Sequence, residues 1–133
     1  MENNIKKYNT ILDMKKVYID VSSIKNANFK KCIENMDIII CLSELTILEI
    51  KNEKVYNGLP NEDFINGLMQ NAIVLKVNNN ILAFAKYLID NFIIPKEQYN
   101  DALHISIAKY YRCYTIMYDK ESLLHKNIDF RYI

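Results

Sequence analysis

Short apolar runs alternate with amphipathic segments along most of this sequence, and this alternation restricts the possible folds more than any other feature. The runs at 17–20, 37–42, 72–77 and 114–118 are rich in β-branched or aromatic residues, and the segments between them carry apolar residues at helical spacing. Consecutive parallel strands need crossover helices, which come to cover both faces of the sheet. The sequence therefore predicts an α/β fold, a three-layer α/β/α sandwich with a mainly parallel sheet and the strand at 17–20 in its centre.

Helices are expected in the segments between these strands. Ser22 and Ser23, then Ser43, and then the asparagines at 78–80 are suited to cap the first turns of three of them. Asn61 can cap a fourth, which Gly67 weakens. The expected helices lie at 22–36, 44–52, 62–70, 81–92 and 97–112, with a helical turn at 120–125 and an edge strand at 128–133.

The length of the chain, 133 residues of which 50% are hydrophobic, suits one globular domain with a substantial core. Residues 1–13 are polar and precede both Met14 and the first apolar run. We therefore expect a flexible N-terminal extension at 1–13 and a single domain at 14–133.

Charge and cysteine content exclude several classes of protein. The formal net charge is +1, so the sequence has neither the basic field typical of many nucleic-acid-binding proteins nor an acidic tail. Cys32, Cys41 and Cys113 lack CxxC spacing and lie in apolar surroundings, which indicates buried thiols in a reducing compartment. The sequence shows no apolar run of membrane-spanning length and no signal peptide, so the expectation is a cytoplasmic protein without a membrane partner.

Asp101 is placed on the apolar side of the expected helix at 97–112, in one stripe with Ile105 and Ala108. Transfer of an isolated carboxylate out of water costs several kcal/mol unless a cation, hydrogen-bond donors or a metal compensates it. An acid satisfied by the free backbone amides of the helix N-terminus is an equally good explanation of this helix taken alone. The choice depends on whether other acids lie nearby.

Three further acids are expected at the same edge of the sheet. Asp20 and Asp119 each follow a strand, and Glu49 lies at the margin of an apolar stripe that includes Leu45 and Leu48. Sites in open α/β sheets form outside the carboxyl ends of the strands, where the strand order reverses. Carboxylates about 4 Å apart repel by roughly 4 kcal/mol per pair at an effective dielectric of about 20, which favours their neutral forms or demands a cation. Oxygen ligands select a hard ion such as Mg²⁺ or Mn²⁺.

Two neighbouring polar residues could assist this site. Glu44 follows Ser43 and is explained as a helix-start acid, although it competes with Glu49 for the second position. His104 lies one turn after Asp101 and could be a ligand or a general base. Beside an all-carboxylate site, a packed and hydrogen-bonded histidine is the preferred interpretation.

Three segments carry a resemblance to a known family: VYIDVSSI at 17–24, ICLSELTILEI at 40–50 and IPKEQYNDALHISIAKYYRCYTIMYDKESL at 94–123. In them the sequence resembles the PIN-domain nucleases and, among these, the VapC-like toxins of bacterial and archaeal toxin–antitoxin pairs. The resemblance implies a metal-dependent endoribonuclease with Mg²⁺ or Mn²⁺ as cofactor. It also implies RNA as substrate, an antitoxin partner and a homodimer.

The resemblance further implies which residues form the site. The four acids that match the family pattern, as catalytic and metal-binding residues, are Asp20, Glu49, Asp101 and Asp119, and Ser22 matches a supporting polar residue two positions after the first acid. These are the same four acids that the topology places at one edge.

Two alternatives remain at this point. The first is a PIN-type RNA-processing nuclease without an antitoxin, which the presence or absence of an adjacent antitoxin gene would separate from a toxin. The second is a non-catalytic α/β domain that binds a partner or resembles a phosphoacceptor receiver. A receiver needs adjacent acids after its first strand, whereas Asp20 is followed by Val21.

Deletion of residues 1–13 is predicted to leave the fold intact, because polar, unpatterned termini rarely repay the entropy lost on ordering. A chain that starts at Met14 should melt within a few degrees, about 5 °C at most, of the full chain in a thermal scan. A larger loss would mean that the extension packs on the domain.

Overall fold

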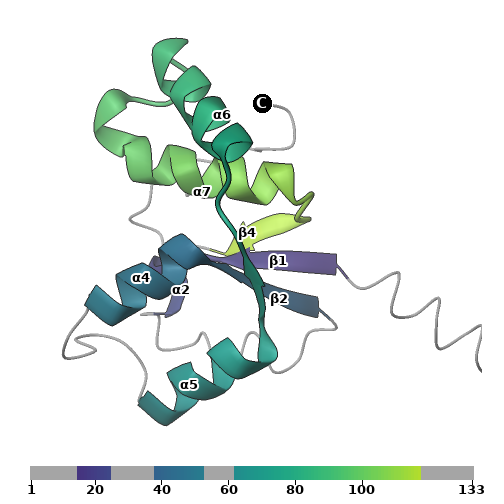
Figure 1. Cartoon of the computed structure of the whole chain (residues 1–133). Helices are drawn as coiled ribbons and strands as arrows, with labels where there is room; N and C mark the ends of the chain where they lie inside the picture. The colour runs from purple at the N-terminus through teal and green to yellow at the C-terminus, as the bar shows by residue number, and fades with distance from the viewer. Residues whose placement is uncertain (1–14, 25–37, 53–61, 118–133) are drawn as a thin grey trace, which may run out of the picture.

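The computed structural model describes residues 15–24, 38–52 and 62–117 and shows within them a four-stranded parallel sheet (Figure 1). The strand order is β3-β2-β1-β4, and every pairing is parallel. The strands are β1 (Lys15–Ile19), β2 (Ile38–Ser43), β3 (Ile73–Leu75) and β4 (Thr115–Met117). The predicted parallel sheet is confirmed, and the strand that contains Val17 lies inside it.

Helices cover both faces of this sheet. In Figure 1, α6 and α7 lie above the sheet, and α5 lies below it. The helices are α2 (Val21–Ile24), α4 (Glu44–Asn52), α5 (Glu62–Asn71), α6 (Asn79–Asp90) and α7 (Tyr99–Tyr110), with a 3-10 turn, η1 (Lys96–Gln98), before α7. This arrangement confirms the three-layer α/β/α sandwich.

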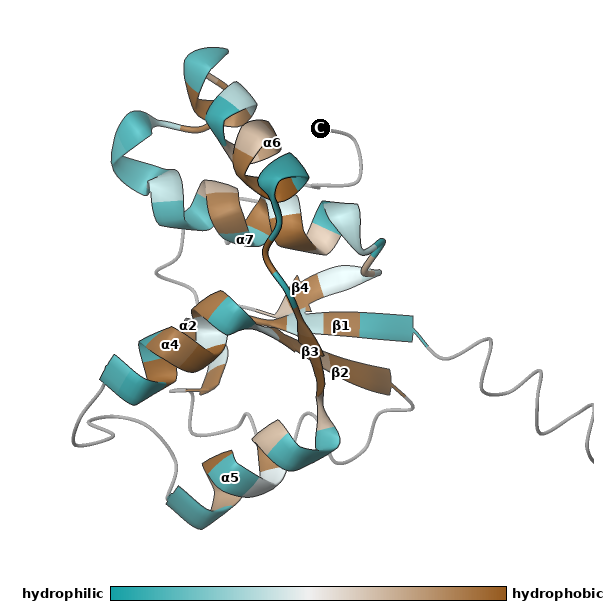
Figure 2. Ribbon diagram, viewed as in Figure 1, coloured by the Kyte–Doolittle hydropathy of each residue, from teal (hydrophilic) through white to brown (hydrophobic). Residues whose placement is uncertain are grey.

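Alternation along the strands divides the core into two apolar layers. Tyr18 and Cys41 pack into a layer beneath α6 and α7, whereas Val17, Ile19 and Leu42 pack into the layer shared with α2, α4 and α5. Successive side chains of a strand point to opposite faces, so each strand supplies both layers. Figure 2 shows the result, with apolar residues along the strands and on the helix faces turned toward the sheet.

The polar residues proposed as helix caps are confirmed at two helices. The Ser43 Oγ accepts a hydrogen bond from the Thr46 N–H at 3.1 Å, and the Asn78 Oδ1 accepts one from the Ile81 N–H at 2.9 Å. Because Asn78 is itself the cap, α6 begins at Asn79, two residues before the expected start. β3 is shorter than the run expected at 72–77.

The cap expected from Ser22 and Ser23 is wrong, because α2 already begins at Val21. The preceding residue is Asp20, and its Oδ1 accepts a hydrogen bond from the N–H of Val21 at 2.9 Å. The Ser23 hydroxyl instead donates to the carbonyl of Asp20 at 2.7 Å. The acid after β1 is therefore held by the helix that follows it.

The face of α4 that packs on the domain differs from the expected one. Leu48 is 55% exposed, whereas Thr46 and Ile50, one turn apart, are buried. A threonine can take the inward position because its hydroxyl finds hydrogen-bond partners there, the carbonyl of Ile19 among them. Glu49 keeps its expected place at the margin of the buried face, with its side chain 21% exposed.

The described residues test two expectations, one about the cysteines and one about membrane-spanning helices. Cys41 and Cys113 are buried free thiols, as predicted. No helix in the described ranges has the length and apolar character needed to cross a bilayer. Several expectations lie outside the described residues: the extension at 1–13, most of the helix at 22–36, the Asn61 cap, Cys32, Asp119, and the elements at 120–125 and 128–133.

Candidate metal centre

Asp20 lies at the carboxyl end of β1, where the strand order reverses. The chain passes from β1 to β2 and β3 on one side, and β4 then pairs with β1 on the other. The N–H of Asp20 donates to the carbonyl of Met117 at 3.0 Å, so the β1–β4 pairing continues to this point. The side chain is 8% exposed. This is the place where open α/β sheets form their sites.

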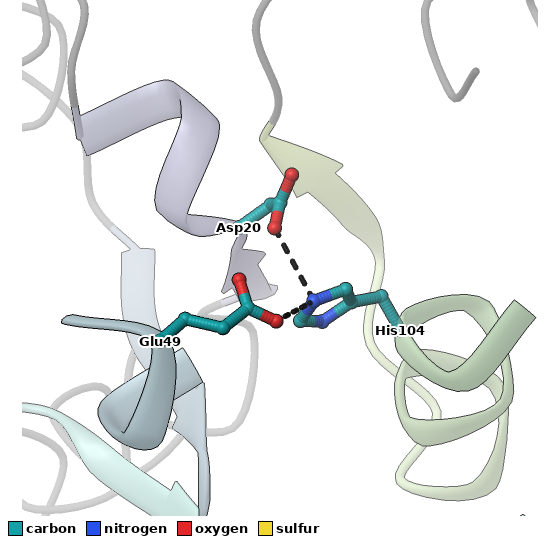
Figure 3. Close-up of side chains that lie close together, drawn as sticks. All are labelled: Asp20, Glu49 and His104. Atoms are coloured by element: carbon teal, nitrogen blue, oxygen red, sulfur yellow. Dashed lines mark hydrogen bonds and ion pairs between the residues drawn. The ribbon is translucent and has the colours of Figure 1, made fainter. Parts of the chain in front are cut away.

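Glu49 reaches the same point from α4. Its Oε1 accepts a hydrogen bond from the Asn100 Nδ2 at 3.0 Å and lies 3.0 Å from the Nε2 of His104 (Figure 3). Both partners come from α7, so the carboxylate joins two helices that are far apart in the sequence. Asn100 is a neutral donor and therefore orients Glu49 without cancelling its charge.

His104 is the residue that connects the two acids. Its Nε2 lies 3.3 Å from the Oδ1 of Asp20 as well as 3.0 Å from the Oε1 of Glu49, and its side chain is 1% exposed. The other ring nitrogen, Nδ1, lies 2.5 Å from the hydroxyl of Tyr18. Figure 3 shows the imidazole edge pointing at both carboxylates. A buried polar ring is thereby given partners at both nitrogens.

The electrostatics of this group favour positive charge on the imidazole. Burial acts to lower the pKa of His104, but the hydrogen bond to Glu49 and the negative charges of Asp20, Glu49 and Asp101 outweigh it. The pKa of His104 is therefore raised above its usual value. The acids at this edge create a potential that attracts a cation, whether a proton or a metal ion.

A chain of buried hydroxyls supports the histidine from behind. The Tyr18 hydroxyl lies 2.7 Å from the Ser43 Oγ and 3.2 Å from the Thr46 Oγ1. The Thr46 hydroxyl donates to the carbonyl of Ile19 at 3.3 Å, which anchors the chain on a group that can only accept. Burial raises the pKa of the Tyr18 hydroxyl, so it keeps its proton. Within the described residues no buried side-chain oxygen or nitrogen lacks a partner.

Together these positions form a possible metal site. One donor atom from each of Asp20, Glu49 and His104 lies within 4.8 Å of the other two. Asp101 is half-buried in the first turn of α7, near enough for its charge to raise the pKa of His104. Two of the four predicted acids are thus brought together directly and a third lies near them.

The other candidate residues are Glu44, Asp119 and Ser22. The Glu44 Oε2 accepts a hydrogen bond from the N–H of Val77 at 3.0 Å, so this acid ties α4 to the segment before α6. That contact agrees with a structural role for Glu44. Asp119 and the side chain of Ser22 lie outside the part of the chain that the structure describes.

Sequence reasoning undervalued His104 and did not single out Asn100. His104 was expected to be packed and hydrogen-bonded, and it is both, but its contacts are the acids of the site themselves. The available signal was its position one turn after Asp101 on the same helix face. For Tyr18, the alternation of side chains along a strand predicts that it points to the opposite face of β1 from Val17 and Ile19. In the structure this face is the layer beneath α7.

Comparisons with known proteins find likeness in structure alone. No family model matches the sequence, and no curated protein matches it. A chain of a toxin–antitoxin complex from Klebsiella pneumoniae superposes with a TM-score of 0.64 at 14% identity, over 86% of this chain and 93% of that chain. Mycobacterium tuberculosis VapC20, described as a sarcin-ricin loop cleaving toxin, gives 0.54 at 11% identity, over 87% and 93%.

At these identities the likeness establishes the fold. The chain has the three-layer α/β/α architecture of a PIN-like domain. Within that class its fold is VapC-like, which confirms at the level of the fold the resemblance seen in the three sequence segments.

The hydroxyl chain behind His104 is predicted to contribute measurably to stability. Thr46→Val keeps the shape of the side chain but removes a buried hydroxyl, so it should lower the free energy of unfolding by about 1–3 kcal/mol. Thr115→Val on β4 is the matched control at an exposed position and should change it by about 0.5 kcal/mol or less. Urea unfolding with a chelator present measures both, and equal effects would contradict a supporting role for the chain.

Proposed function

We propose that this protein is a metal-dependent endoribonuclease that hydrolyses RNA phosphodiester bonds and acts as the toxin of a toxin–antitoxin pair. The observation that carries the proposal is the meeting of Asp20 and Glu49 at the carboxyl end of β1, on either side of a histidine nitrogen (Figure 3). Support for the nuclease class comes from the fold, which VapC20 shares.

The donor set suits a divalent ion. Two carboxylates from different elements converge, and the charge of a third acid reaches the same point. Hard oxygen donors favour Mg²⁺ or Mn²⁺. The acids proposed to hold one or two such ions, and to be the catalytic residues, are Asp20, Glu49, Asp101 and Asp119, with Ser22 in a supporting role. A bound ion of this kind lowers the pKa of water and offsets negative charge on phosphoryl oxygens.

The protein's own residues preorganise the acids for this task. The N–H of Val21 holds the Oδ1 of Asp20, and the Nδ2 of Asn100 holds the Oε1 of Glu49. Because both donors are neutral, these two hydrogen bonds fix the carboxylates in place without neutralising their charge. Neither a cysteine nor a serine nucleophile is needed for such hydrolysis, since water is the attacking group.

The partners follow from the same comparison. RNA is proposed as the substrate because VapC20 is described as cleaving the sarcin-ricin loop. An antitoxin is proposed because the other similar chain belongs to a toxin–antitoxin complex. A homodimer and a cytoplasmic location complete the proposal, as the sequence resemblance implies.

Two acids of α4 provide a matched test of this proposal. Glu49→Gln should reduce RNA cleavage in Mn²⁺ by about a hundredfold or more, because it removes a charge from the site. Glu44→Gln should cleave at close to the wild-type rate, because an amide oxygen can still accept from the N–H of Val77. Cleavage of a total RNA preparation, with and without a chelator, measures both variants.

Several outcomes of this assay would contradict the proposal. Wild-type cleavage that persists in excess chelator would exclude a metal-dependent reaction. Equal loss of activity in the two variants would mean that position 49 has no special role in the site. Absence of cleavage by the wild-type protein on every RNA tested would argue against the nuclease itself.

Asp101→Asn separates a metal-site acid from a helix-start acid by the sign of its effect. If Asp101 only stabilises the start of α7, the change should lower the free energy of unfolding by about 0.5–2 kcal/mol. If Asp101 instead belongs to a cluster of like charges, the change should leave the metal-free protein equally stable or more stable. We expect the second result, together with loss of RNA cleavage.

The same variant should respond weakly to metal. A site filled at a hundredfold excess over its dissociation constant stabilises the native state by about 2.7 kcal/mol, and Asp101→Asn should lose much of this gain. Thermal melts of wild type and variant, each in chelator and in Mn²⁺, measure both effects. A variant that is less stable in chelator yet keeps the full response to Mn²⁺ would show that Asp101 is only a cap.

A further inference from the structure

The Nε2 atom of His104 occupies the point where the two acids converge. It lies 3.0 Å from the Oε1 of Glu49 and 3.3 Å from the Oδ1 of Asp20, and the three donor atoms lie within 4.8 Å of one another. The three side chains come from α7, α4 and the end of β1, and all point inward to this position (Figure 3). The imidazole is therefore part of the donor group rather than a neighbour of it.

The separations of the His104 Nε2 from the two carboxylate oxygens are compatible with ligands of a common ion. Ligand atoms about 2.1 Å from an ion lie about 3.0 Å apart at a right angle and about 3.4 Å apart at the tetrahedral angle. The two contacts of His104, at 3.0 and 3.3 Å, fall in this interval. A single N–H can point well at only one of two acceptors, whereas an ion can contact all three donors.

We propose that Nε2 of His104 is itself a metal ligand beside Asp20 and Glu49. The resulting mixed nitrogen–oxygen site selects a transition ion such as Mn²⁺ over Mg²⁺. Tyr18 is the positioning residue for the imidazole. The inference rests on the proposed metal site, but it differs from an all-carboxylate site in both donor set and ion preference.

Tyr18 has the properties that such a role requires. A ligating histidine donates the hydrogen of its other ring nitrogen to an acceptor, which fixes the tautomer and the orientation of the ring. Here Nδ1 lies 2.5 Å from the Tyr18 hydroxyl, which can accept that hydrogen while donating its own to Ser43 at 2.7 Å. The Tyr18 side chain is fully buried. When an ion displaces the proton from Nε2, the neutral ring keeps its hydrogen on Nδ1 and directs the Nε2 lone pair at the site.

The nitrogen donor changes the ion that the site prefers. Mg²⁺ takes oxygen ligands in a near-ideal octahedron and dehydrates reluctantly. Imidazole nitrogen suits transition ions and adds little for Mg²⁺. A site of two carboxylates and one imidazole therefore favours Mn²⁺ or a later transition ion, whereas oxygen donors alone would discriminate less.

Pulsed electron paramagnetic resonance of bound Mn²⁺ tests the ligand directly. The full chain with one equivalent of Mn²⁺ should show electron spin echo modulation from a directly coordinated ¹⁴N nucleus. His104→Gln should lose the modulation, and His125→Gln, which removes the other histidine of the sequence, should keep it. If His104→Gln does not fold, wild-type protein labelled with ¹⁵N-histidine decides, because the ¹⁴N modulation must then be replaced by that of ¹⁵N.

Titration with Mn²⁺ and with Mg²⁺ tests the preference and the positioning role. Tyr18→Phe should weaken Mn²⁺ binding by about 10–100-fold and Mg²⁺ binding much less, so the preference falls. Tyr111→Phe is the matched control, since its hydroxyl donates to the carbonyl of Lys76 and not to the donor group. It should leave both affinities unchanged. A general loss of structure would instead reduce the two affinities together, which overturns the positioning role.

The possible failures can be told apart. If Mn²⁺ binds the wild-type protein without nitrogen modulation, the inference is overturned. An oxygen-only metal site and the proposed nuclease activity would still stand. Equal affinities for Mn²⁺ and Mg²⁺ in the wild-type protein would overturn the predicted preference. If neither Mn²⁺ nor Mg²⁺ binds at millimolar concentration, both the inference and the proposed metal dependence are overturned.

Discussion

The contact of one buried imidazole with two carboxylates is the interaction on which the rest of this structure depends. Asp20 and His104 are almost completely removed from water, and burial of charge without compensation costs several kcal/mol. Each compensates the other, and Glu49 completes the balance from α4. Because the three side chains belong to different elements, this balance holds only if β1, α4 and α7 keep their relative positions. The charge balance of the site therefore depends on the packing of these three elements.

The topology of the parallel sheet brings the carboxyl end of β1 close to α4 and α7. All four strands are parallel, so their carboxyl ends lie at the same edge, and the strand order reverses beside β1. The side chains of β1 then have separate tasks: Val17 and Ile19 pack into one apolar layer, while Tyr18 turns to the other and brings its hydroxyl to His104. A polar group in the core is tolerated there because Ser43 and Thr46 satisfy it.

Local signals predicted those features that depend on neighbours in the sequence. The strand that ends just before Asp20, the caps at Ser43 and Asn78, and the helix that carries Asp101 were all predictable, because hydrophobic periodicity and capping act over a few residues. The same reasoning misplaced Leu48. Helical spacing alone ranks leucine above threonine for the buried face, and it has no knowledge of the carbonyl of Ile19, which makes the inward position acceptable for Thr46.

The sequence by itself determined the class of fold, the edge at which a site is expected and two acids that meet there, Asp20 and Glu49, because parallel topology follows from the order of strands and helices. Only the tertiary structure decided which side chains meet there. His104 is separated from Asp20 by more than eighty positions and from Glu49 by 55, so their contact depends on the register in which α7 packs against β1 and α4. Long-range packing also decided that Glu44 contacts Val77 while Glu49, five residues later on the same helix, contacts the histidine. A helix turns about 100° per residue, and sequence alone does not say toward which neighbour each direction points.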